Sequence, residues 1–136
     1  MENQSYQGHQ AHILIVDQNQ DALALLKTVL SRRGYQVTTA QDGLEGLEKF
    51  RHGQFQLILT DLSTARLSGW ELGRIVKETS PGVRVALVTA WDFGTMPEHS
   101  PFDAIIPKPF HFDEFRGVVD SLMRDKSGGY CTPEVM

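Results

Sequence analysis

The chain has 136 residues and a formal net charge of −4, and its fractions of hydrophobic (40%) and charged (22%) residues are typical of a globular domain. The longest aliphatic run, residues 13–16, is far shorter than the roughly 20 residues of a membrane helix. The polar start of the chain is unlike a secretory signal, and the only cysteine, Cys131, excludes a disulfide framework. Mild acidity argues against direct nucleic-acid binding, and the length leaves no room for a second output domain.

In chain order, residues 1–10 are polar and without periodicity, so we expect a flexible N-terminal tail. A single domain is predicted over 11–125, where short apolar runs alternate with amphipathic segments. Residues 126–136 contain Gly-Gly and a proline and are predicted to form a flexible C-terminal tail. Five runs rich in Ile, Val, Leu and Thr are predicted strands: 12–17, 35–40, 55–61, 83–89 and 103–107.

Four segments between or after these strands carry apolar residues at helical spacing. The predicted helices are 20–33, 43–52, 67–79 and 111–124. Gly34 and Gly53 lie where helix C-caps are expected. The interval 91–102 contains one glycine and two prolines without a helical stripe, so a loop or a shortened, irregular fourth helix is predicted there.

Alternating strands and helices predict a doubly wound α/β fold, in which helices cover both faces of a parallel sheet. The strand at 35–40 alternates in polarity and is the predicted edge. Ligands of such sheets bind beyond the carboxyl ends of the strands. Four of the five predicted strands place polar residues at or just beyond that edge: Asp17 with Gln18, Asp61, Thr89 and Lys108.

These residue types point to phosphoryl chemistry. A pair of carboxylates can hold Mg²⁺, which prefers oxygen ligands and keeps several waters. A carboxylate can also act as a nucleophile and form an aspartyl-phosphate. A lysine supplies a point charge, and a threonine a hydroxyl donor, for phosphate oxygens.

Four motifs carry a resemblance to a known family: ILIVD (13–17), ILTDLSTARLSGWEL (58–72), VALVTA (85–90) and IIPKPF (105–110). Over roughly residues 11–125 the chain resembles the receiver domain of two-component response regulators. The resemblance implies a flavodoxin-like sheet of strand order 2-1-3-4-5. It also implies transfer of a phosphoryl group from a histidine kinase to one aspartate, with Mg²⁺ as cofactor.

Carried over residue by residue, the resemblance makes Asp61 the phosphoacceptor and Asp17 an acidic metal ligand. Thr89 matches the hydroxyl that follows the phosphoryl group, and Lys108 matches the lysine that pairs with it. The remaining matches are the metal-ligating backbone carbonyl of Ser63, the small residue Ala90 and a cis bond between Lys108 and Pro109.

Three departures from the family pattern affect these expectations. Gln18 replaces the second acidic residue, so it would contact Mg²⁺ weakly or through water, and Mg²⁺ binding should be weaker. Ile105 replaces the aromatic switch residue. Thr64 and Ala65 replace the usual Met-Pro, and the fourth helix is eroded, so the usual output face should differ.

The main hypothesis is a cytoplasmic phosphorelay receiver that accepts a phosphoryl group from a histidine kinase or phosphotransfer protein and signals through a downstream protein partner. It would contact neither nucleic acid nor membrane, and at most it would catalyse its own phosphoryl transfer and autodephosphorylation. The alternative is a pseudo-receiver that binds or scaffolds proteins independently of phosphorylation, which Gln18 and Ile105 favour. A flavodoxin-like redox enzyme is disfavoured, because the loop after the first strand lacks the composition of a flavin phosphate loop.

Overall fold

A computed structural model of the chain describes residues 11–62, 64–90 and 100–124, which form a five-stranded parallel sheet of order β2-β1-β3-β4-β5. The strands are β1 (His12–Val16), β2 (Gln36–Ala40), β3 (Leu57–Thr60), β4 (Arg84–Thr89) and β5 (Ala104–Pro107). The helices are α1 (Gln20–Ser31), α2 (Gly43–His52), α3 (Gly69–Thr79) and α4 (Phe112–Arg124). The predicted doubly wound, flavodoxin-like fold is confirmed, and β2 lies at an edge as expected.

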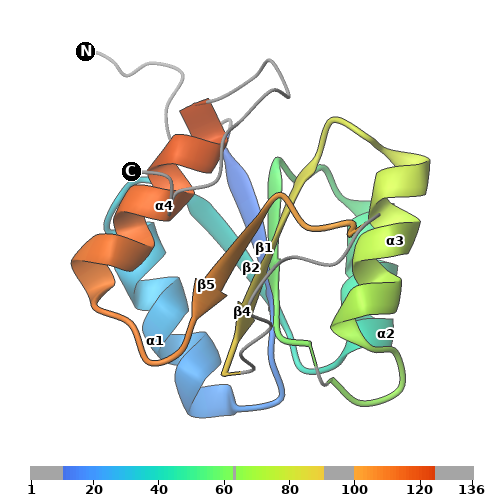
Figure 1. Ribbon diagram of the computed structural model, residues 1–136, viewed down its shortest axis with the longest axis horizontal. Helices are drawn as coiled ribbons and strands as arrows, with labels where there is room; N and C mark the ends of the chain where they lie inside the picture. Colours follow the sequence, from blue (N-terminus) through green and yellow to red (C-terminus); the bar gives the residue numbers. More distant parts are fainter. Residues whose placement is uncertain (1–10, 63, 91–99, 125–136) are drawn as a thin grey trace.

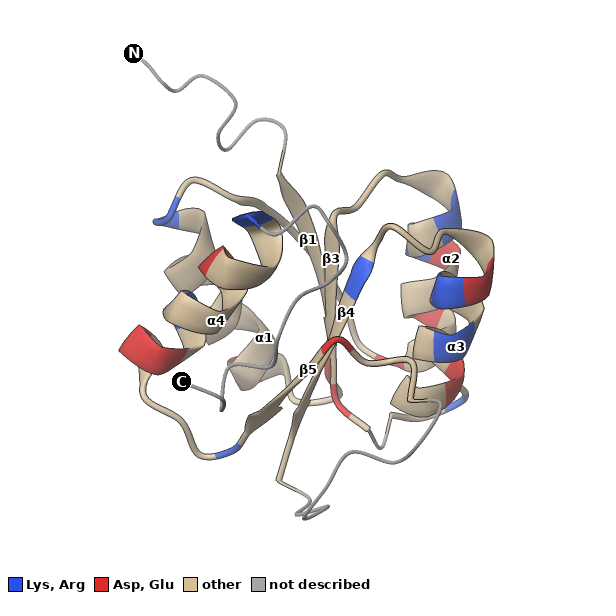
Figure 2. Cartoon of the chain, turned by 45° about the horizontal axis from the view of Figure 1, so that its top comes forward, with Lys and Arg blue, Asp and Glu red and all other residues tan. Residues whose placement is uncertain are grey.

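Helices cover both faces of the sheet, with α1 and α4 on one side and α2 and α3 on the other (Figure 1). Alternate residues of β1 point to the two faces, so that Ile13 and Ile15 join one core cluster while Leu14 and Val16 join the other. Charged residues of both signs lie side by side along α2 and α3, whereas the strands are almost uncharged (Figure 2). None of the helices that the structure describes combines the length and apolar character needed to cross a bilayer.

Two helix ends differ from the prediction by two residues, and α4 begins one residue later than predicted. Helix α1 ends at Ser31 with Arg32 as its C-cap, and Gly34 follows at a φ of 97°, whereas Gly53 is the C-cap of α2 as expected. Helix α3 begins at Gly69 instead of residue 67, because the Ser68 side chain accepts a hydrogen bond from a backbone amide in the first turn.

Several predictions fall on residues that the structure does not describe. The irregular fourth helix was expected in 91–102, of which 91–99 lie outside the described residues. Both predicted tails, 1–10 and 126–136, lie outside them as well. The described residues before β5 pack on α3: the Phe102 ring meets the Trp70 ring edge-on at a centroid distance of 5.4 Å. Phe102 is thereby part of the core cluster on the α2 and α3 side of the sheet, against which Trp70 packs.

The loop between β3 and α3 approaches two glycines too closely for any side chain. A Cβ at Gly43, the first residue of α2, would lie 1.8 Å from the carbonyl oxygen of Leu67. A Cβ at Gly69 would lie 2.0 Å from the carbonyl oxygen of Asp61. Both obstacles are backbone atoms, so the start of α2 and the start of α3 fix the path of this loop.

We expect Gly43→Ala to lower the free energy of unfolding by about 1–3 kcal/mol, because the new methyl group overlaps the Leu67 carbonyl and the loop must move. Gly117→Ala is the matched control, since a Cβ on the exposed Gly117 of α4 meets no atom within 4 Å. That substitution should raise stability by about 0.5–1 kcal/mol through helix propensity. Urea unfolding measures both; equal effects would contradict the close packing at Gly43.

Candidate functional site

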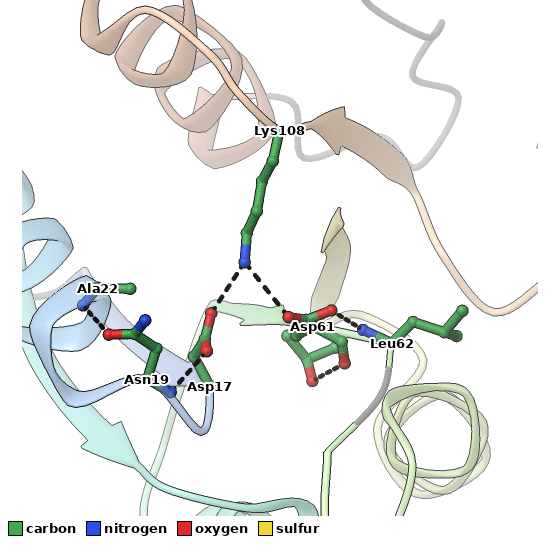
Figure 3. Close-up of polar contacts among 7 residues, drawn as sticks. Asp17, Asn19, Ala22, Asp61, Leu62 and Lys108 are labelled. Carbon is green, nitrogen blue, oxygen red and sulfur yellow. Dashed lines mark hydrogen bonds and ion pairs between the residues drawn. The ribbon is translucent and has the colours of Figure 1, made fainter. Parts of the chain in front are cut away.

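The side chain of Lys108 lies between two carboxylates from two other strands (Figure 3). Its Nζ is 3.2 Å from Oδ2 of Asp17 and 3.3 Å from Oδ2 of Asp61. Asp17 directly follows β1, Asp61 directly follows β3, and Lys108 directly follows β5. The sheet register aligns the last residues of β1 and β3, so the two aspartates emerge next to each other. The structure thus brings these three predicted residues together.

Each carboxylate is fixed by the backbone on the oxygen that does not face Lys108. Oδ1 of Asp17 accepts a hydrogen bond from the Asn19 amide at 2.9 Å, and Oδ1 of Asp61 accepts one from the Leu62 amide at 2.6 Å. Asp17 is only 6% exposed, and its own amide donates to the carbonyl of Ala40. Both Oδ2 atoms are therefore held toward one common point, which the ammonium group occupies.

Asn19 is a supporting residue that the sequence reasoning missed. Its backbone amide holds Asp17, while its side-chain oxygen accepts from the Ala22 amide and caps α1. The signal was present, because an asparagine just before a helical stripe is a common N-cap. The start of α1 and the orientation of the first carboxylate thus depend on one residue.

Lys108 and Thr89 are linked through the backbone. The amide of Lys108 donates to the carbonyl of Thr89 at 2.9 Å, and the bond from Lys108 to Pro109 is cis, as the resemblance implied. Thr89 ends β4, is fully buried and has further interactions, while Ala90 after it is exposed. Thr89 therefore lies at the same edge of the sheet as the charged residues.

The charges of the site balance only in part, since two carboxylates face one ammonium group. Burial lowers the pKa of Lys108, but the charges and hydrogen bonds of Asp17 and Asp61 together outweigh it and raise that pKa above its ordinary value. Lys108 is therefore charged throughout the physiological range, and the site carries a formal charge of −1.

The donor set fits a hard cation such as Mg²⁺, because two carboxylate oxygens already converge on a positive charge. In the described parts of the chain no group of three or more His, Cys, Asp or Glu residues gathers as a metal site. Gln18 is exposed beside Asp17, and Ser63, the expected carbonyl ligand, lies outside the described residues. The protein thus offers two acidic ligands, and amide, carbonyl or water oxygens would have to complete a metal shell.

Ile105 and Thr64, which depart from the family pattern, both contact neighbouring residues of the domain. Ile105 is half-buried and lies against the core cluster on the α2 and α3 side of the sheet. The buried Thr64 donates its hydroxyl to the Leu67 carbonyl at 2.5 Å, while Ala65 is exposed. Thr64 therefore stabilises the loop after Asp61 with a hydrogen bond within the loop.

Comparisons with known proteins show the family to which this chain belongs. Residues 13–120 match the family described as the response regulator receiver domain. The sensor histidine kinase AtsR of Burkholderia thailandensis is 32% identical over 117 residues, which cover 82% of this chain and 19% of that protein. The response regulator receiver protein CpdR of Brucella abortus is 27% identical over 114 residues, 82% of this chain and 95% of that protein.

A solved structure of the response regulator TrrA from Thermotoga maritima, in complex with Mg²⁺-BeF, covers 82% of this chain and 98% of its own. Its TM-score is 0.75 at 31% sequence identity. The chain belongs to the response regulator receiver domain family and is a receiver domain of two-component systems. It spans about a fifth to a quarter of the length of the first curated relatives it matches.

Replacing Lys108 should expose the cost of placing two carboxylates together. We expect Lys108→Met to lower the free energy of unfolding at neutral pH by about 1–3 kcal/mol, because Asp17 and Asp61 lose their shared cation. Lys27→Met, on the exposed side of α1, is the control and should change stability by less than about 0.5 kcal/mol. Equal effects in urea unfolding would contradict the ion pairs.

The stability difference between wild type and Lys108→Met is also expected to depend on pH. Folding raises the pKa of Lys108, so its ammonium group stabilises the fold below the ordinary pKa of 10.5, and this contribution is lost as the pH rises through the folded value. The stability difference between wild type and Lys108→Met should be constant at neutral pH and shrink above about pH 10.5.

Proposed function

We propose that this chain accepts a phosphoryl group from a phosphohistidine donor on Asp61 and signals by changing its affinity for a protein partner. The observation that carries the proposal is the convergence of Asp17, Asp61 and Lys108 from three strands on one point. A related structure supports the donor class, since TrrA was solved in complex with the histidine kinase ThkA at 31% identity to this chain and a TM-score of 0.76.

In the proposed reaction, a carboxylate oxygen of Asp61 attacks the phosphorus atom of the donor. An oxygen–phosphorus bond forms, the nitrogen–phosphorus bond breaks, and the imidazole leaves with the bonding electron pair. Lys108 lies 3.3 Å from the Asp61 carboxylate, so its ammonium group can move to the oxygens of the transferred group and stabilise their charge. The hydroxyl of Thr89 would donate to one of these oxygens.

Mg²⁺ bound to Asp17, Asp61 and the Ser63 carbonyl, with Gln18 contributing weakly or through water, would neutralise charge on the phosphoryl oxygens. The chain's own contribution is to hold both acidic ligands in place through the Asn19 and Leu62 amides before anything binds. Such prior orientation lowers the free energy that the reaction must spend on ordering the site.

Phosphorylation would act on partners by a population shift, because the transferred group adds charge where Lys108 now balances the carboxylates. When Lys108 turns to the phosphoryl oxygens, its contact with Asp17 must lengthen or break. Ile105 offers no hydroxyl and no ring to report this change, so the readout would differ from that of relatives with an aromatic residue there. A downstream protein partner, with no direct contact to nucleic acid or membrane, is the proposed output.

The proposed acceptor is tested by incubation with acetyl phosphate and Mg²⁺, followed by mass spectrometry of the intact protein. We expect wild type to gain the mass of one phosphoryl group and Asp61→Asn to gain none. Asp103→Asn is the control, because Asp103 also lies next to a lysine, Lys77, but before β5 at the opposite ends of the strands. That variant should still form the adduct. An adduct that persists in Asp61→Asn would contradict the assignment.

A pseudo-receiver is the second candidate function. The observation that favours it is that the site has only two acidic ligands among the described residues, because Gln18 replaces the second acidic residue of the family pattern. It predicts no adduct on wild type and unchanged partner binding by Asp61→Ala. The phosphoryl-transfer proposal predicts the adduct and a difference in partner binding between unmodified and phosphorylated protein.

Gln18→Asp should tighten Mg²⁺ binding by about tenfold, because it restores a negative charge beside the two carboxylates; the full Coulomb term is larger, but desolvation offsets part of it. Tryptophan fluorescence during a Mg²⁺ titration measures this, since Trp70 is the second residue of α3 after the Asp61 loop. Gln20→Asp adds the same charge two residues further on and is the control. Equal affinities of Gln18→Asp and wild type would place residue 18 away from the ion.

A further inference from the structure

The loop that follows Asp61 contains a strained residue, Arg66. Among the described residues it is the one non-glycine with a positive φ, at 69°. The amide of Leu67 donates to the carbonyl of Ala65 at 2.7 Å across it, which makes a three-residue γ-turn. A left-handed conformation is unfavourable for a residue with a Cβ, so it persists only where neighbouring contacts hold it.

The contacts that hold this turn come from the start of α2. Arg66 donates from Nε and Nη2 to the two oxygens of Asp42, at 3.1 and 3.3 Å. The same carboxylate accepts from the Glu45 amide at 2.8 Å and thereby caps α2. The amide of Gly43 donates at 3.2 Å to the Ala65 carbonyl, the same oxygen that accepts from Leu67 in the turn. Asp42 therefore anchors Arg66 to the first turn of a helix.

Hydrogen bonds within the loop connect the γ-turn to Asp61, the proposed phosphoacceptor. Thr64 bonds through its hydroxyl to the Leu67 carbonyl, and the Gly69 amide bonds to the Leu62 carbonyl at 2.8 Å. The Leu62 amide in turn holds the carboxylate of Asp61. Displacement of the γ-turn would therefore reach Asp61 through two short hydrogen-bonded steps.

We propose that Arg66 is a positioning residue for Asp61: its ion pair with Asp42 holds the strained turn and so fixes the backbone that carries the acceptor carboxylate. This inference rests on the proposed phosphoryl transfer. Among the described residues, the side chain of Arg66 pairs with Asp42 and not with Asp61 or Lys108, so it acts on Asp61 through the loop. A purely structural ion pair would stabilise the fold without affecting the transfer rate.

Three substitutions at position 66 separate these roles. Arg66→Ala removes the ion pair and keeps the strain, Arg66→Gly removes both, and Arg66→Lys keeps the charge but loses the two-pronged contact. We expect all three to slow phosphorylation by acetyl phosphate about twofold to fivefold, the range that an exposed ion pair can supply. Arg66→Gly should nevertheless be more stable to urea than Arg66→Ala, because glycine adopts this φ freely.

The diagnostic result is that the glycine variant is more stable than the alanine variant yet transfers no faster. A rate that follows stability, recovering in Arg66→Gly, would overturn the inference. Amide hydrogen exchange gives a readout independent of the reaction: exchange at Leu67 and Gly69 should accelerate in Arg66→Gly and Arg66→Ala. Unchanged exchange at both amides would also overturn it.

Asp42→Asn is the reciprocal test, because asparagine still caps α2 but carries no charge for Arg66. Its effect on the rate should match that of Arg66→Ala, and the double variant should be no slower than either single one. Arg74→Ala is the control: it removes an exposed arginine paired with Glu71 and Glu78 on α3 and should leave the rate unchanged.

If wild type forms no adduct, the proposed function and this inference fall together. If wild type reacts and the position-66 variants react at the same rate, the inference alone falls.

Discussion

The ammonium group of Lys108 is shared by two carboxylates that come from different strands, and the rest of the site is arranged around this contact. Two like charges held close together are costly unless a cation lies between them. The contact is possible because parallel strands end at the same edge and because β1 and β3, which the two aspartates follow, are neighbours in the sheet. The sheet order therefore determines which charges meet, and Lys108 ties the last strand to the two central ones.

The absence of a third carboxylate changes the balance at this edge. With Gln18 beside Asp17, the lysine and the two aspartates leave one formal negative charge, so Lys108 alone compensates half of the acidic charge. A divalent cation at the same point would compete with the ammonium group for both Oδ2 atoms. If the missing charge at Gln18 weakens Mg²⁺ binding as proposed, the affinity for the cation is the quantity that separates phosphoryl transfer from scaffolding.

Much of the fold could be predicted from the sequence because it depends on periodicity, which is local. Strand β1 alternates between two cores and α1 follows a helical stripe, so both were recognisable within a residue or two. The proximity of Asp17, Asp61 and Lys108 followed from strand ends in a parallel sheet. The start of α3 was misplaced because the apolar Leu67 extends the helical pattern, while the actual start depends on the Ser68 cap. The orientation of the Asp61 carboxylate depends on the loop amide of Leu62, which no sequence pattern encodes, whereas the N-cap signal at Asn19 beside Asp17 was present but not used.

The γ-turn at Arg66 could not be predicted from the sequence either, because it depends on contacts between the loop and α2. Arginine has no preference for a positive φ, so only the packing of α2 against the loop makes that conformation favourable. Gly43 permits this packing because its missing side chain leaves space for the Leu67 carbonyl, and Gly69 does the same beneath Asp61. The loop after Asp61 is thus fixed from two helix starts as well as from β3. Each of these contacts involves at least one backbone atom, which cannot turn away as a side chain can. A small change at the start of α2 must therefore move the loop after Asp61, or part of that loop must unfold.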